Sequence, residues 1–248
     1  MKHFILTIFN EIFPDIDSYG LQDNNLGIND DWLRQRLDVF FRITDKSIRL
    51  QTNKNFVWLV KCSYKTPQWA RQELSKSCAI LDYSEPLWRV LNEQRLYESV
   101  YEHKINSNRV LSKYAFQKSI KLEITTPEEV ITTRLDSDDG LASDYVNLVQ
   151  QRAKLGRFID FCNGLILKEK SLFVYNRHQR HPSQFCSYKE LVTNKVKTVY
   201  FLHHILANPC DYYDELGWVQ TNHTFNLNNH KTRLFKEYQG NKAGFMFL

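Results

Sequence analysis

Two periods of apolar residues organise the first half of the chain. Residues 3–9 and 56–60 are nearly continuous apolar runs, which are typical of parallel strands buried on both faces. Residues 32–48 instead place apolar side chains at helical spacing, and a second helix is predicted to open at Thr66. A third short strand is predicted at residues 79–81. This order predicts β-α-β units, and therefore a parallel sheet with right-handed crossovers.

The first predicted helix is amphipathic. Asn29 and Asp30 are candidate N-caps that directly precede its first apolar residues. Its polar face carries Arg34, Arg36 and Asp38, and a charged stripe of this kind usually faces solvent. We therefore interpret these three charges as a solvated surface.

The main chemical signal follows a β-branched run at residues 130–135. Val, Ile and Thr favour a buried strand and Asp and Gly end one, so Asp136, Asp138 and Asp139 are expected at the strand's carboxyl end. Ligands bind at that end in open α/β sheets. Like charges this close need compensation from a cation, an arginine or backbone amides, and a divalent metal is the simplest.

An alternative interpretation of the acids is a polar turn in which Asp139 caps a helix that begins near Leu141. The strand before the acids, and Arg134 two positions upstream of the first one, favour a binding site instead. We therefore expect a site at these acids, with the cap as its alternative.

The rest of the chain is predicted from the same patterns. In order, it shows mainly helical residues over 85–122, a helix over 141–156, a β-hairpin of residues 158–167 and 172–175, and a strand or buried helix over 199–205. The carboxyl-terminal segment is less regular. The whole pattern predicts a single α/β domain over residues 1–248, with a first half that ends near residue 140 at the acids.

Composition narrows the class of protein. With 248 residues and 42% hydrophobic residues, the chain can bury a full core. No apolar run reaches the length of a membrane span and no signal peptide is evident, so we expect a cytoplasmic protein. Its five cysteines include no C-x-x-C pair, which favours reduced, buried thiols. The net charge of +5 allows a nucleotide diphosphate, an anionic membrane surface or nucleic acid as partner, without choosing among them.

Glycine-rich phosphate loops are missing from the sequence. None of the eight glycines are two positions apart, so neither the G-x-G-x-x-G fingerprint nor a P-loop is present. Ordinary Rossmann dehydrogenases and P-loop enzymes therefore lose their main support. A bound nucleotide would have to be held by metal and side chains.

Several blocks of sequence resemble the putative rhamnosyl transferase family, in that family's order. They are HFILTIFN at 3–10, WLRQRLDVFFRITDKSIRLQTNKNFVWLV at 32–60, TPQWARQEL at 66–74, VITTRLDSDD at 130–139 and WVQTNH at 218–223. The resemblance implies a GT-A type glycosyltransferase, with a mostly parallel Rossmann-like sheet flanked by helices. It implies a nucleotide-sugar donor, Mn²⁺ or Mg²⁺, and a glycan or lipid-linked acceptor, at the inner face of the membrane and without nucleic acid. Two departures are Ile8, where arginine is expected, and Thr224-Phe225, where small residues are expected.

The resemblance also implies roles for single residues. The acids Asp136 and Asp138, with a late histidine, His223, would bind the metal. Arg134 or the basic cluster over residues 177–180 would neutralise phosphate. The remaining expected contacts to the nucleotide are Thr7, Asp136, Ser137 and Asp139.

The catalytic base is the least constrained residue. An inverting transfer needs a carboxylate near the acceptor hydroxyl, and Asp214 and Glu215 are the candidates, with a solvated acidic loop as the alternative. Two other functions stay open. One is a two-metal nuclease or phosphatase, which needs more strand-end acids than the sequence offers, and the other is a non-catalytic module that binds sugar nucleotides.

Overall fold

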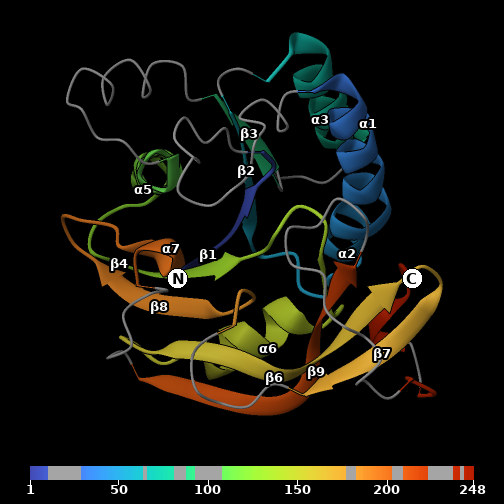
Figure 1. Ribbon diagram of the computed structural model, residues 1–248. Helices are drawn as coiled ribbons and strands as arrows, with labels where there is room; N and C mark the ends of the chain where they lie inside the picture. The colour runs from blue at the N-terminus through green and yellow to red at the C-terminus, as the bar shows by residue number, and fades with distance from the viewer. Residues whose placement is uncertain are drawn as a thin grey trace, which may run out of the picture.

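One mixed sheet runs through the part of the chain that the computed structural model describes (Figure 1). That part comprises residues 1–10, 29–63, 66–80, 88–92, 108–176, 183–202, 209–222, 237–240 and 243–248. Within it the strands are ordered β3-β2-β1-β4-β8-β6-β9-β5, and β7 pairs with β6. The expected α/β class is therefore confirmed.

The first half of the sheet is parallel, as the apolar runs predict. Its strands are β1 (Lys2–Ile8), β2 (Val57–Cys62), β3 (Trp88–Asn92) and β4 (Glu128–Arg134). β1 lies between β2 and β4 and is parallel to both, and β3 extends the sheet beyond β2. The acidic strand is thus inside the sheet, next to the first strand of the chain.

The third strand is not where the sequence predicts it. Residues 79 and 80 belong to α3 (Gln68–Ile80), and β3 instead lies in a region predicted to be helical. An apolar run as short as 79–81 does not distinguish a strand from the last turn of a helix. Parallel pairing with β2 decides the conformation of residues 88–92, because cross-strand contacts override weak local preference.

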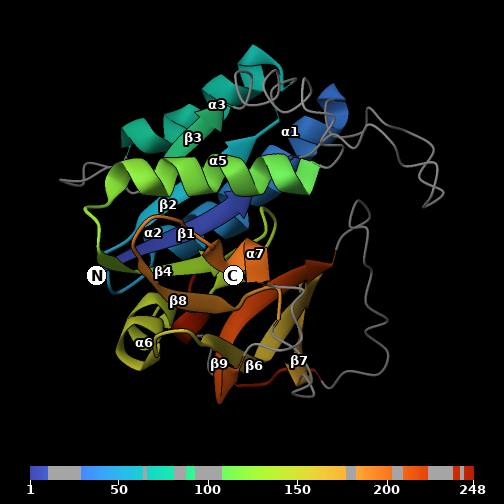
Figure 2. The same ribbon diagram turned by 90° about the vertical axis from the view of Figure 1, so that its left-hand side faces the viewer.

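Helices cover both faces of the parallel half (Figures 1 and 2). Successive strand residues point to opposite faces, so Ile5 packs with α1 (Asp30–Val39) and α3, whereas Phe4 and Leu6 pack with α5 (Asn108–Glu123). Both faces of these strands are therefore buried, which accounts for their continuous apolar sequence.

The second half of the sheet is mixed. Its strands are β5 (Gly140–Leu141), β6 (Phe158–Lys168), β7 (Ser171–Asn176), β8 (Ser187–Val192) and β9 (Cys210–Asn222). The same part of the chain contains the helices α6 (Tyr145–Arg152), α7 (Thr198–Leu202) and η5 (Ala243–Phe245). β8 is antiparallel to both β4 and β6, which it joins, whereas β9 is parallel to β6. The predicted hairpin is confirmed as β6 and β7. The expectation of a mostly parallel sheet holds only for the first half.

The first predicted helix is confirmed with one irregularity. The side chain of Asn29 accepts hydrogen bonds from the backbone N–H groups of Asp31 and Trp32, as an N-cap does. After α1, the turns widen into a π-helical segment, η3 (Phe40–Asp45), and then return to α-helix in α2 (Lys46–Arg49). Among the described helices, none combines the length and apolar character needed to cross a bilayer.

The buried His3 makes stability depend on pH. Its ring lies in β1 within 2.7 Å of the Thr133 hydroxyl and receives a hydrogen bond from Gln150, and burial lowers its pKa to about 3. The folded state therefore keeps His3 neutral, while the unfolded chain binds a proton below the ordinary histidine pKa of about 6.5. This stability is complete above that value and is lost as pH falls from about 6.5 toward 3.

We expect the wild type to lose about 2 kcal/mol more unfolding free energy than His3→Gln when pH falls from about 7.5 to about 5. The reason is that only the wild type takes up a proton at residue 3 when it unfolds. Urea unfolding of both proteins across this range measures the difference. The glutamine keeps a hydrogen-bonding side chain without a titrating group, so it tests the slope rather than the absolute stability. Parallel pH profiles of the two proteins would contradict the assignment.

Candidate functional site

The acidic loop lies where the sequence predicts it, at the carboxyl edge of the parallel strands. The backbone N–H of Leu135 donates to the Leu6 carbonyl at 3.0 Å, and the Ser137 hydroxyl donates to the Phe9 carbonyl at 3.1 Å. These bonds fix the loop after β4 to the end of β1. Asp136, Ser137, Asp138 and Asp139, which we call the acidic loop, therefore occupy the edge where α/β sheets bind ligands.

Asp138 is held by an arginine from α1. The Arg36 Nη1 atom is 2.7 Å from Asp138 Oδ2, and Arg36 Nε donates to the Ser137 hydroxyl at 3.0 Å. Both charged side chains are largely buried, with 16% of Arg36 and 9% of Asp138 exposed. Charge-assisted bonds in such a poorly hydrated place are stronger than surface ion pairs.

Asp139 is the most buried acid of the loop. Its Oδ1 accepts a hydrogen bond from the backbone N–H of Thr221 at 2.8 Å, and the Thr221 hydroxyl donates to the Asp138 carbonyl at 2.8 Å. Gln184 approaches Oδ2 at 3.5 Å. Burial, and then the charges of Asp138 and Asp136, raise the pKa of Asp139 well above its usual range.

The capping alternative for Asp139 is wrong. Gly140 and Leu141 form β5, which pairs with β9, and the next helix, α6, begins only at Tyr145. The Asp139 carboxylate instead accepts a hydrogen bond from Thr221 of β9, because β9 pairs with β5 directly after Asp139. The acids therefore belong to a junction between β4, β5 and β9.

Asp136 has its own arginine. Arg134 Nε and Nη2 donate to the two oxygens of Asp136 at 3.1 and 3.2 Å, a bidentate pair. The Arg134 guanidinium also lies 5.5 Å from the centre of the Tyr200 ring. Burial opposes the positive charge of Arg134, but Asp136 and Tyr200 outweigh it, so its pKa is raised. Arginines thus flank the acidic loop from α1 and from β4.

The other described site candidates contact partners outside the acidic loop. Thr7 is fully buried, and its hydroxyl accepts a hydrogen bond from the Trp58 indole at 2.9 Å, so it lies in the core. Asp214 and Glu215 are exposed on β9, and Glu215 pairs with Arg152 at 2.6 Å. Glu215 precedes Thr221 by six positions on the same strand, about 20 Å at the usual rise per residue. The acidic run is therefore part of a strand and not the solvated loop of the alternative interpretation.

Other predicted residues cannot be placed. His223 and the basic cluster over residues 177–180 lie outside the described residues. The described part of β9 ends at Asn222, next to Thr221, which contacts the backbone and side chains of the acidic loop. The metal role of His223 stays a prediction.

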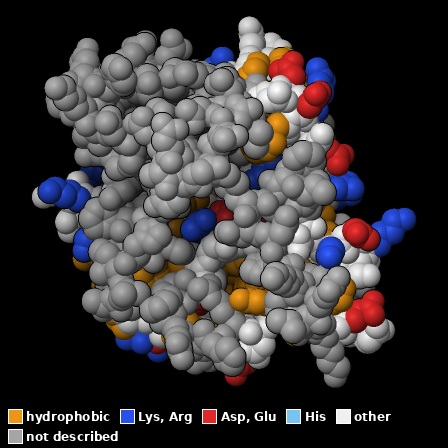
Figure 3. Space-filling model, in the orientation of Figure 1, with side chains coloured by type: hydrophobic (Ala, Val, Ile, Leu, Met, Phe, Trp, Pro, Cys, Tyr) orange, Lys and Arg blue, Asp and Glu red, His pale blue; other side chains and the backbone are white. Residues whose placement is uncertain are grey.

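Sequence reasoning missed Arg36, Thr221 and Gln184. Arg34 and Asp38 do face solvent, over a surface where acidic and basic side chains intermix on α1 and α3 (Figure 3). Arg36 differs because it lies three positions after Leu33 and four before Phe40, and both are buried. That spacing places it at the margin of the apolar face. The burial of Arg36 could therefore have been predicted from its helical spacing, whereas the contact of β9 with the acids could not.

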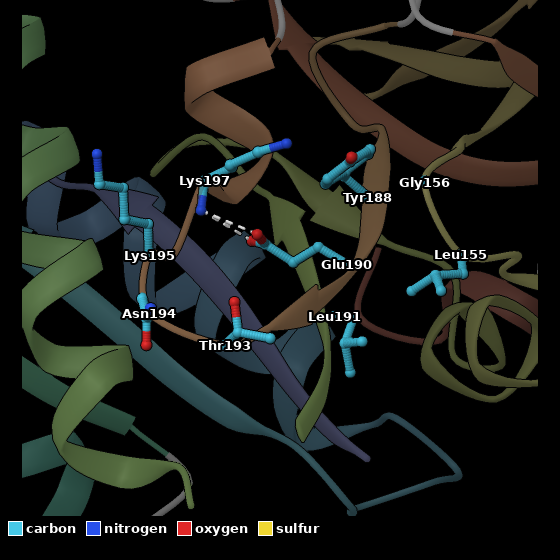
Figure 4. Close-up of a pocket in the computed structure, with 9 residues that line it drawn as sticks. All are labelled: Leu155, Gly156, Tyr188, Glu190, Leu191, Thr193, Asn194, Lys195 and Lys197. Carbon is cyan, nitrogen blue, oxygen red and sulfur yellow. Dashed lines mark hydrogen bonds between the residues drawn. The ribbon is translucent and has the colours of Figure 1, made fainter. Parts of the chain in front are cut away.

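A depression on β8 lies away from the acidic loop. Its walls are Leu155, Gly156, Tyr188, Glu190, Leu191, Thr193, Asn194, Lys195 and Lys197 (Figure 4). Glu190 points to the backbone there, and its carboxylate accepts the N–H groups of Lys197 and Thr198 at about 3 Å. Leu191 pairs with Glu129, near the amino end of β4. Glu190 therefore holds the turn before α7 and belongs to the scaffold.

Carboxylate oxygens are the donors that hard divalent cations prefer. Within the described residues, no group of three His, Cys, Asp or Glu side chains is arranged to hold a metal ion. Each carboxylate nevertheless has about four acceptor positions, of which Arg134 uses two on Asp136. Asp136 and Asp138 thus fit the donor chemistry of Mn²⁺ or Mg²⁺ and offer part of a coordination shell.

Comparison with known proteins adds one finding. The model of a family described as putative rhamnosyl transferase matches residues 23–233, most of the chain. This range includes Arg36, the acidic loop and Thr221. None of the curated proteins compared with the chain gives a match.

Proposed function

The chain belongs to the putative rhamnosyl transferase family, and from this premise we propose that it moves a sugar from a nucleotide-activated donor to an acceptor hydroxyl. The acidic loop, flanked by Arg36 and Arg134 at the carboxyl edge of the sheet, carries the proposal. Parallel β1, β2 and β4, with acids directly after the carboxyl end of β4, also support a GT-A-like domain. Its first 140 residues would bind the donor, and residues 141–248 would form the acceptor side.

The arrangement suits departure of a nucleoside diphosphate. Breaking the sugar–phosphate bond places negative charge on the diphosphate, and preorganised cations stabilise that charge. The Arg134 guanidinium is already held beside the loop by Asp136 and the Tyr200 ring, so it needs little reorganisation. Thr221 and Ser137 keep the acidic loop in position through hydrogen bonds.

We propose Mn²⁺ or Mg²⁺ as the cofactor, held by Asp136 and Asp138. When bound, a divalent ion would act as a Lewis acid toward the diphosphate oxygens. Asp139 would support the loop through Thr221 instead of binding the ion, because its Oδ1 is engaged by the backbone there. His223 remains the proposed additional ligand.

The acceptor side is less constrained. The family description points to rhamnose as the sugar, and we propose a glycan or lipid-linked acceptor at the cytoplasmic face of a membrane. Asp214 and Glu215 remain only predicted as the base, and the ion pair of Glu215 with Arg152 does not favour it. A two-metal nuclease is less well supported, since no additional cluster of acids joins the loop within the described residues.

The test is a thermal-shift screen of nucleoside diphosphates and nucleotide sugars, with and without Mn²⁺. A ligand present at about 100 times its Kd adds about 2.7 kcal/mol of stability. We therefore expect one nucleotide to raise Tm by roughly 5–10 °C, and to need Mn²⁺ to do so. Nucleoside monophosphates are the matched controls. The proposal fails if no nucleotide sugar or diphosphate raises Tm and none is turned over to free diphosphate.

A further inference from the structure

Arg36 forms an ion pair with Asp138, one of the two acids expected to bind the metal. Its Nη1 lies 2.7 Å from Asp138 Oδ2, so a guanidinium already sits where a divalent cation would take its oxygen. Two cations at one carboxylate oxygen repel each other, and the small exposed fraction of both side chains weakens screening by water. A metal ion at this Asp138 oxygen therefore requires Arg36 to withdraw.

Several contacts besides the one to Asp138 hold the Arg36 side chain in place. Its Nε donates to Ser137 at 3.0 Å, and Ser137 is in turn bonded to the end of β1. The guanidinium also lies 5.5 Å from the centre of the Trp32 ring, one turn earlier on α1. Asn29 caps that helix, so the base of the side chain is fixed as well. These contacts direct Arg36 toward the acidic loop.

The charges of the loop show what Arg36 does there. Asp136 is neutralised by Arg134, and Asp139 is stabilised by the backbone N–H of Thr221. Arg36 supplies the compensating charge at Asp138. Removing it would leave largely buried carboxylates that attract another cation more strongly.

We propose that Arg36 is a resident counter-ion that a divalent cation must displace from Asp138, and that it thereby sets the metal affinity of the site. The inference rests on the proposed metal-dependent function. In the free protein Arg36 holds the acidic loop together and keeps metal affinity low. Once displaced, its guanidinium is available to the donor's diphosphate, so metal and donor bind cooperatively.

The experiment measures Mn²⁺ binding to the full chain without any nucleotide, by calorimetry or by the spin-resonance signal of free Mn²⁺. Arg36→Met keeps the aliphatic stem without the charge and should bind Mn²⁺ at least tenfold more tightly than the wild type. Arg36→Lys, which keeps a charge but loses the fork between Ser137 and Asp138, should fall between the two. Arg34→Met is the matched control, because Arg34 lies on the same helix over the Trp69 ring and should leave the affinity unchanged.

The outcomes separate this inference from the proposed function. If the wild type binds Mn²⁺, Asp138→Asn abolishes binding, and both Arg36 variants match or fall below the wild type, only the inference is overturned. If neither the wild type nor the Arg36 variants bind Mn²⁺, the inference and the metal-dependent function both fail. Should Arg36→Met not fold, Arg36→Lys decides by the same measurement: at least threefold tighter Mn²⁺ binding supports displacement, and any smaller change overturns it.

Discussion

Asp138→Asn is expected to abolish metal-dependent binding of the nucleotide donor, with a loss of more than about 100-fold in affinity. The substitution keeps the side-chain volume but removes the negative charge and one anionic oxygen, which are what a divalent cation binds. Titration calorimetry with the donor and Mn²⁺ measures the loss. An unchanged affinity in this variant would remove Asp138 from the site.

The same substitution should also lower stability. Repulsion among the acids alone predicts a slight gain, but Arg36 would lose its partner while only 16% exposed. We therefore expect a cost of about 1–3 kcal/mol in unfolding free energy, with the native circular dichroism spectrum retained. Asp38→Asn is the matched control, because that exposed acid pairs with Arg42 on the same stretch of helix and should change neither property.

The largest expected effect on stability comes from Gly164→Ala in β6. A Cβ atom there would lie 2.3 Å from two carbons of the Trp218 ring, which is too close for any real contact. The ring has little room to move, because it stacks on Phe185 at 4.5 Å and donates to the Phe161 carbonyl at 2.9 Å. We expect a loss of at least about 3 kcal/mol, at the upper end of overpacking costs. Urea unfolding measures it.

Gly244→Ala provides the comparison for this prediction. A Cβ at Gly244 meets no atom within 4 Å, so its unfolding free energy should stay within about 0.5 kcal/mol of the wild type. Trp218 lies three positions before Thr221, so Gly164→Ala should also weaken donor binding. Equal midpoints for the two glycine variants would show that the tryptophan can move aside.

The parallel half of the fold was predictable because its signals are local. Continuous apolar runs identified β1 and β2, and the change from Thr133 to Asp136 identified the end of β4. The run at residues 79–81 misled because it is short, and β3 depends on pairing with β2. The antiparallel β8 was not predictable either, since its direction is set by its neighbours β4 and β6.

The candidate site likewise combines residues that local sequence predicts with contacts that it does not. The place of Asp136 and Asp138 at a strand end was predictable because charge and strand end coincide in sequence, and that of Arg134 because it is two positions away. The contact of Thr221 with Asp139 links residues 82 positions apart and leaves no local trace. Thr7 lies near the carboxyl end of β1, but its hydroxyl accepts a hydrogen bond from Trp58, 51 positions away, which no local pattern indicates.

The hydrogen bonds of the acidic loop also determine when the loop can reach its final structure during folding. Arg36 is 101 positions from its Ser137 partner, and Thr221 follows Asp139 by 82 positions. Contacts with such long sequence separation form slowly, because loop closure costs entropy before the contact repays it. A nascent chain cannot complete the edge until β9 has been synthesised. Completion of the hydrogen bonds around the acidic loop is therefore a late event in folding and depends on nearly the whole chain.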